Sequence, residues 1–139
     1  MIAKWFSITV LLPVAVVVAL PSFGQSAATH CRQPKSDLRI RVSSGVVGSI
    51  RHTEVLPDAS DLKSVKNADI LVNILIDQDG SVICAKGAKG DPSLIPRSEE
   101  AALKWTFAPY FINGTPIVVE GHFVFHFHKG KVSVKFDQR

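Results

Sequence analysis

The stretch from Ile70 to Lys86 constrains the fold of this chain more than any other part of the sequence. Apolar residues recur at every second position from Ile70 to Ile76, which is the pattern of a strand that buries one of its faces. The turn sequence DQDG follows and ends at Gly80, and glycine tolerates the positive φ that tight turns require. Residues 81–85 then have the apolar character of a returning strand. The stretch therefore predicts a β-hairpin.

The two aspartates of this turn, Asp77 and Asp79, raise the question of a calcium site. A calcium loop needs further oxygen ligands after its glycine and a glutamate at its closing position. Neither follows Gly80 in this sequence. We therefore assign both carboxylates to the turn, where they can accept hydrogen bonds from neighbouring backbone N–H groups.

Residues 1–24 have the features of an export signal. Lys4 supplies a short positive region, an apolar run extends from Trp5 to Leu20, and small residues at positions 22 and 24 match a signal-peptidase site. Pro13 interrupts the run, which is shorter than the roughly 20 residues of a membrane-spanning helix. The sequence predicts cleavage after Gly24, and an uncleaved membrane anchor is the alternative.

The charge and motif content exclude several classes of function. The 139-residue chain has 16 basic and 12 acidic residues and a net charge of +4, and without Lys4 the mature part keeps 15 basic residues and a charge of +3. This bias suits an anionic surface such as the cell wall, but it is too weak to indicate nucleic-acid binding. No GxSxG, HExxH or phosphate-loop motif occurs. We therefore expect one domain without catalytic residues or a cofactor.

Export also bears on the only two cysteines. In an oxidising compartment Cys31 and Cys84 can form a disulfide that persists. Such a bridge would tie a polar N-terminal arm to the second strand of the hairpin. The alternative is two unpaired thiols, one of them buried in the sheet as a small apolar residue. The count and spacing exclude a CxxC motif or a zinc cluster.

The segments on either side of the hairpin alternate between strand and helix patterns, so the fold class is α+β. An arm with a short strand occupies residues 25–45, and the rest of the domain spans residues 46–136. The expected elements are a strand over 38–42, a return strand over 46–50, a helix over Asp58–Ala68, a helix from Ser93 or Pro96 to Thr106, a strand over Val118–His128 after an Asn113-Gly114 turn, and a lysine-rich strand over Lys131–Phe136.

The strand over Val118–His128 places three phenylalanines on one face and His122, His126 and His128 on the other. Three histidines on one face suggest a metal site. On a flat strand, however, about 7 Å separates His126 from His128 and about 13 Å separates His122 from His126, which is too far for one ion. We therefore expect solvated histidines and no metal, and a two-histidine site completed by His30 or His52 is the alternative.

Three segments in fixed order match the pattern of a known family. The first is VNILIDQDGSVICAKGAKGDPSL, residues 72–94, which contains the hairpin and a G-x-P-x-L type connection. The second is EEAALKWTFAPY, residues 99–110, an alanine-rich helix that ends in an aromatic-x-Phe-x-Pro segment. The third is INGTPIVVEGHFVFHF, residues 112–127, an Asn-Gly turn before an aromatic strand. Together they resemble the C-terminal domain of the TonB energy-transducer family, over roughly residues 46–127.

This resemblance implies a fold and a mode of binding. The family fold has two helices on one face of a small antiparallel sheet, which here would hold three to four strands. Family members lie in the periplasm of Gram-negative bacteria, and the domain binds a short peptide of outer-membrane receptors by adding it as a strand at the sheet edge. The resemblance places this partner-binding edge on the last long strand, at Ile117, Val119, Phe123, Phe125 and Phe127.

Two departures from the family pattern shape the functional hypothesis. The segment Trp5 to Leu20 lacks the histidine of the family's transducing anchor, and the proline-rich stalk is missing. The leading hypothesis is a secreted, non-enzymatic periplasmic interaction module that binds a receptor peptide, peptidoglycan or a second copy of itself. The alternatives are a minimal energy transducer anchored in the inner membrane and a histidine-dependent metal-binding periplasmic protein.

Overall fold

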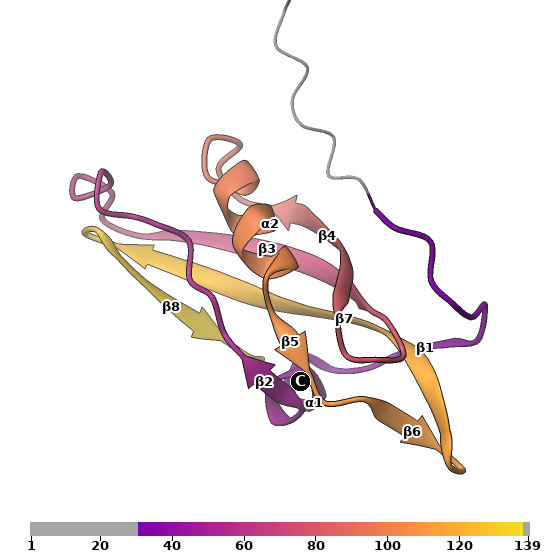
Figure 1. The fold of residues 1–139 in the computed structure, drawn as a ribbon. Helices are drawn as coiled ribbons and strands as arrows, with labels where there is room; N and C mark the ends of the chain where they lie inside the picture. The colour runs from indigo at the N-terminus through magenta and orange to yellow at the C-terminus, as the bar shows by residue number, and fades with distance from the viewer. Residues whose placement is uncertain (1–30, 138–139) are drawn as a thin grey trace, which may run out of the picture.

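The structure is a computed structural model that describes residues 31–137 (Figure 1). It is an α+β fold with a sheet of six strands, a separate sheet of two strands, and two helices. The segment 1–24, the start of the arm and His30 lie outside the described residues. The elements are β1 (Arg39–Arg41), α1 (Ser44–Ser49), β2 (Arg51–Thr53), β3 (Ala68–Ile76), β4 (Val82–Lys89), α2 (Ile95–Leu103), β5 (Thr106–Phe107), β6 (Tyr110–Ile112), β7 (Thr115–His128) and β8 (Lys131–Lys135).

The β3–β4 hairpin forms as the sequence predicts. The two strands pair antiparallel, and Gly80 in the turn has a φ of 88°. Asp79 accepts hydrogen bonds from the N–H and the hydroxyl of Ser81, at 3.0 and 2.6 Å. The Asp77 carboxylate accepts the N–H of Gln78 at 2.9 Å. Both aspartates therefore stabilise the turn.

The long strand β7 lies inside the sheet, so the prediction that it forms the edge is wrong. On one side it pairs antiparallel with β3, from Val119 to Phe127. On the other side it pairs parallel with β1 and then antiparallel with β8. The five residues assigned to the binding edge are each at most 3% exposed: Ile117, Val119, Phe123, Phe125 and Phe127. The expected three or four strands became six because β1 and β6 also add to β7.

The helix α2 lies within the predicted range, but the helix expected over Asp58–Ala68 does not form. Leu62 and Val65, the apolar residues of that pattern, reach the core instead through two short turns, with hydrogen bonds from Leu62 N–H to Ala59 O and from Val65 N–H to Leu62 O. The last residue of that range, Ala68, begins β3. A segment without its own helical hydrogen bonds can thus still bury its apolar side chains.

The helix α1 occupies a segment where the sequence indicated a return strand. Ser43 caps the helix by accepting the N–H of Val46 at 3.4 Å. Val47 is fully buried, and it packs where Gly121 of β7 carries no side chain, since a Cβ there would lie 2.3 Å from Val47 Cγ2. The missing side chain of Gly121, a residue distant in sequence, therefore leaves the space in which the buried Val47 of this helix packs.

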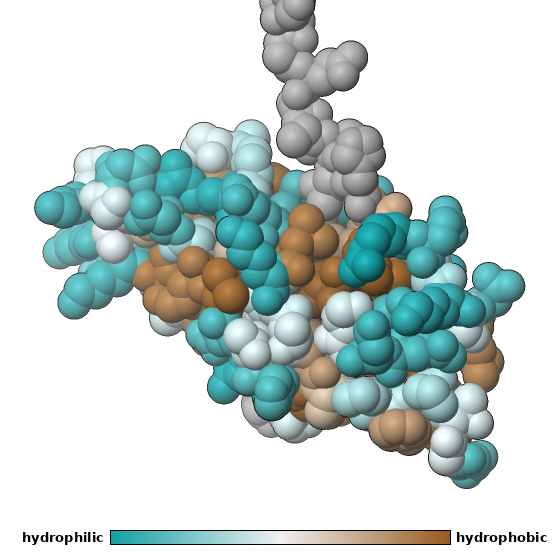
Figure 2. All heavy atoms as spheres, viewed as in Figure 1, coloured by the Kyte–Doolittle hydropathy of each residue, from teal (hydrophilic) through white to brown (hydrophobic). Residues whose placement is uncertain are grey.

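The core lies on the face of the sheet that carries the three phenylalanines of β7. Trp105, which follows α2, is 1% exposed, and its ring stacks on Phe123 with centroids 4.5 Å apart. Hydrophobic atoms also reach the surface at the lower right of Figure 2, over the β6–β7 hairpin, where Phe111 is 58% exposed and Ile112 38%.

Candidate functional site

The second face of the sheet carries a hollow lined by both charged and apolar side chains, which we call the open-face hollow. It has a volume of about 640 Å³ and lies between β1 and β4. Its floor consists of neighbouring rows across β7, β3 and β4, because Glu120 faces Leu75 and His122 faces Asn73 in the register. Its lining residues are Arg39, Arg41, Asn73, Ile74, Leu75, Cys84, Lys86, Glu120, Gly121 and His122.

In the first row of the hollow, a carboxylate lies between two guanidinium groups. Glu120 of β7 accepts from Arg39 and from Arg41 of β1, each at 3.2 Å. The hydrogen bond from Arg39, followed by that from Arg41, holds the pKa of Glu120 below its ordinary value. This arrangement reinforces the short parallel pairing of β1 with β7, which spans only three residue pairs.

The second row consists of His122, Asn73 and Lys86, from three adjacent strands. The register places Asn73 of β3 opposite His122 on one side and opposite Lys86 on the other. Among residues 31–137, none of these three side chains has a hydrogen bond or ion pair. The hollow therefore presents donor groups with no partner of their own.

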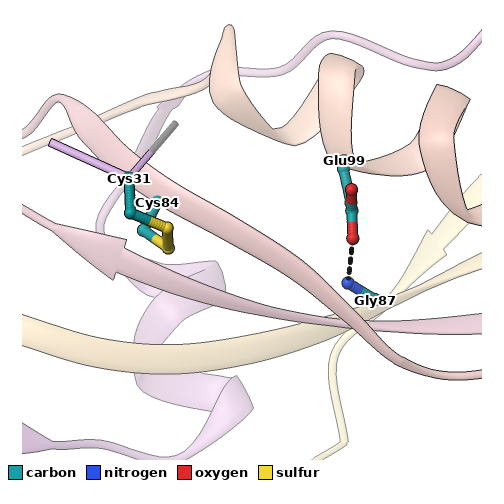
Figure 3. The surroundings of a disulfide bond; sticks show 4 residues. All are labelled: Cys31, Cys84, Gly87 and Glu99. Carbon is teal, nitrogen blue, oxygen red and sulfur yellow. Dashed lines mark hydrogen bonds between the residues drawn. A yellow bond between two sulfur atoms is a disulfide. The ribbon is translucent and has the colours of Figure 1, made fainter. Parts of the chain in front are cut away.

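The N-terminal arm forms part of the rim of the hollow. The structure contains the disulfide expected from the sequence, between Cys31 in the arm and Cys84 in β4 (Figure 3). Next to it the Arg32 N–H donates to Ile83 O at 2.9 Å, and further on the Val118 N–H donates to Leu38 O at 3.3 Å. The arm thus runs from the outer edge of β4, past the hairpin turn, to β1 (Figure 1).

Replacement of both cysteines by serine, Cys31→Ser with Cys84→Ser, should lower the free energy of unfolding by up to about 4 kcal/mol. The bridge joins residues 53 apart in sequence, and a cross-link of that span restricts the unfolded chain by about this amount in the chain-entropy model. Urea unfolding of the variant and of the wild type, each with and without reductant, measures the loss. Reductant should affect only the wild type, and equal stability of the variant and the oxidised wild type would contradict the prediction.

The outer edge of β4 is covered at the level of Gly87 by a side chain from α2. The Glu99 carboxylate accepts the Gly87 N–H at 2.8 Å (Figure 3). No local sequence pattern marks the reach of Glu99 to a strand twelve residues earlier. With Arg32 bound at Ile83, this contact leaves little of the β4 edge accessible to a new strand.

The histidines of β7 do not gather at one point. His126 pairs with Asp69 of β3 at 2.5 Å, and this hydrogen bond holds the pKa of Asp69 below its ordinary value. His128 bonds the Lys66 carbonyl oxygen, and its ring stacks on that of His126 with centroids 6.4 Å apart. His122 lies in the hollow. Within residues 31–137 no group of three possible metal ligands comes together.

The outer edge of β8 carries a regular charge pattern. Lys131, Ser133 and Lys135 are exposed on the same face as the hollow, because Ser133 pairs with His126. Val132 and Val134 alternate with them and are half-buried against the core. On its outer side β8 pairs with no strand of the described part of the chain.

These features define, within residues 31–137, an α+β domain with a buried helix-bearing face, a basic hollow on the opposite face and an outer edge of β8 that pairs with no strand. A scan against protein-family models, a search of curated proteins and a search of solved structures each found no match to this chain. No helix within residues 31–137 is long and apolar enough to cross a membrane.

Proposed function

We propose that this chain is a secreted, non-catalytic periplasmic module that binds an extended acidic segment of a partner protein by adding it as a strand to the outer edge of β8. The observation that carries the proposal is the state of the sheet edges. β7 is paired on both sides, and β4 is capped by Arg32 and Glu99. Among residues 31–137 the outer edge of β8 pairs with no strand, and with five residues it is longer than the other unpaired edges of its sheet, those of β1 and β6, which have three residues each.

The backbone of β8 is arranged to receive a strand. Lys129 and Gly130 form the two-residue turn between β7 and β8, with φ values of 47° and 80°. The pair that closes such a turn, here His128 and Lys131, exchanges both of its backbone hydrogen bonds. Because N–H groups alternate in direction along a strand, those of Val132 and Val134 point away from β7. These two groups would bond the added segment.

The charges of β8 favour an acidic partner over a second copy of the chain. In an antiparallel pairing of two β8 strands centred on Ser133, Lys131 of one copy would face Lys135 of the other. Like charges directly opposite each other destabilise a strand pair. An acidic segment would instead place a carboxylate opposite each lysine. The family resemblance implies a peptide of an outer-membrane receptor as the partner, and the lysines of β8 add the preference for an acidic one.

The disulfide supports the periplasmic part of the proposal, since such bonds persist in oxidising compartments and are rare in the cytosol. The resemblance to TonB C-terminal domains and the expected export signal indicate the same location.

Titration of the isotope-labelled protein with the peptide acetyl-Glu-Val-Glu-Val-Glu-amide tests the binding edge. We expect amide shifts at residues 131–135 and slower hydrogen exchange at Val132 and Val134. The charge reversal Lys131→Glu should weaken binding about fivefold, because an attractive cross-strand pair becomes repulsive. Lys135 is left unchanged, since it already pairs with Asp69 at 3.7 Å. Lys89→Glu, at the opposite edge of the sheet, is the matched control and should bind normally.

The same peptide with lysine in place of each glutamate distinguishes specific strand addition from non-specific binding. It should not bind the wild type, and it should bind the charge-reversed variant. Equal binding of both peptides, or shifts confined to another strand, would overturn the proposal.

A further inference from the structure

We propose that the open-face hollow is a binding site for a carboxylate attached to a short apolar group, with Lys86, His122 and Asn73 as its donors. The site is separate from the β8 edge, and the inference does not rest on the proposed function. The shared chemistry could come from a free carboxylic acid or from the C-terminus of a peptide.

The geometry of the second row supports this assignment. Adjacent strands lie about 4.8 Å apart, so His122 and Lys86 stand on either side of Asn73 at roughly 10 Å from each other. A carboxylate above Asn73 lies within reach of the amide, the imidazole and the long lysine side chain. The same three groups have no partner among residues 31–137, so no existing bond must break for the ligand to bind.

The charges around the hollow favour an anion. Its lining has three cationic side chains, Arg39, Arg41 and Lys86, against the single carboxylate of Glu120. Glu120 already bridges both arginines, and within residues 31–137 no carboxylate forms an ion pair with Lys86. Hydrogen bonds between an ammonium group and a carboxylate are stronger than those between neutral groups.

The apolar part of the floor distinguishes an organic acid from an inorganic anion. Leu75 and the Cys84 side chain line the hollow next to the polar row, since Leu75 faces Cys84 in the register. An alkyl or alanyl group adjoining the carboxylate would cover these side chains. Phosphate has no such group, so it should bind more weakly.

Calorimetric titration of the oxidised protein with acetyl-Ala-Ala, hexanoate and inorganic phosphate tests the site. We expect both carboxylates to bind, phosphate to bind at least tenfold more weakly, and acetyl-Ala-Ala-amide to show no binding. Tighter binding of acetyl-Ala-Ala than of hexanoate indicates that the carboxylate comes from a peptide C-terminus, and the reverse order indicates a free carboxylic acid. Phosphate that binds as tightly as the carboxylates, or an amide that binds as tightly as the acid, would overturn the assignment.

Variants locate the binding to the hollow. Lys86→Gln should raise the Kd for acetyl-Ala-Ala at least tenfold, and Asn73→Leu should raise it by removal of the central donor. Lys89→Gln, on the same strand but outside the lining, is the matched control and should leave the Kd unchanged. Equal Kd values for Lys86→Gln and the wild type would refute the site. The charge reversal in β8 should not alter this Kd, so the outcome is independent of the strand-addition test.

Discussion

Replacement of Gly80 by alanine should reduce the free energy of unfolding by about 3 kcal/mol or more. A Cβ at this position would lie 1.9 Å from the carbonyl oxygen of Phe107, a backbone atom that cannot rotate away. The φ of 88° adds strain, because a side chain is unfavourable in this region. The Phe107 N–H also donates to Gly80 O at 2.8 Å, so a shift that relieves the clash would break the contact between the hairpin turn and β5.

Gly114→Ala is the matched control for this substitution. Gly114 also has a positive φ, of 76°, but a Cβ there would meet no atom within 4 Å. It should therefore cost only the backbone strain of about 1 to 2 kcal/mol. Urea unfolding of both variants measures the difference. Equal losses of unfolding free energy in the two variants would show that backbone strain alone causes the destabilisation and that the contact with Phe107 O contributes nothing.

Replacement of Trp105 by alanine should reduce the free energy of unfolding by about 3 to 5 kcal/mol. The ring is buried, stacks on Phe123 and makes an edge contact with Phe125 at 6.0 Å between centroids. Its Nε1–H donates to Val55 O at 2.7 Å, so the indole also holds the segment between β2 and β3 against the core.

Trp105→Phe separates the two roles of the indole. It keeps an aromatic ring on Phe123 but leaves the Val55 carbonyl without its donor, so it should cost less than the alanine variant. Hydrogen exchange should speed up along the segment around Val55 in both variants. A phenylalanine variant as unstable as the alanine variant would show that the hydrogen bond, and not the packing, dominates.

Local patterns predicted the elements whose stability arises from their own residues. The β3–β4 hairpin follows from alternation and a glycine turn, and α2 follows from Pro96 at its start and an alanine-rich face. The β7–β8 pair follows from a second alternating run after Lys129-Gly130. The row formed by His122, Asn73 and Lys86, which have no hydrogen-bond partner within residues 31–137, was not predicted, because strand pairing alone brings these residues together.

The errors have a common physical origin in contacts between distant residues. The pattern over Asp58–Ala68 satisfies a helix, but in the folded protein two turns pack the half-buried Leu62 and Val65 against the core without one. Likewise the buried Val47 of α1 packs in space that Gly121 of the distant strand β7 leaves open.

The opening hairpin shows which properties belong to the sequence and which to the tertiary structure. Alternation from Ile70 to Ile76 and the glycine of the turn determine that two strands pair, since these preferences act between neighbours in the chain. The strands that lie beside this hairpin are not determined by local preferences. Contacts between strands distant in sequence decide that β7 lies inside the sheet and that the outer side of β8 pairs with no strand among residues 31–137. Strand pairing rests on backbone hydrogen bonds, which nearly every residue can make. The sequence of β7 alone therefore does not identify the strands that pair with it.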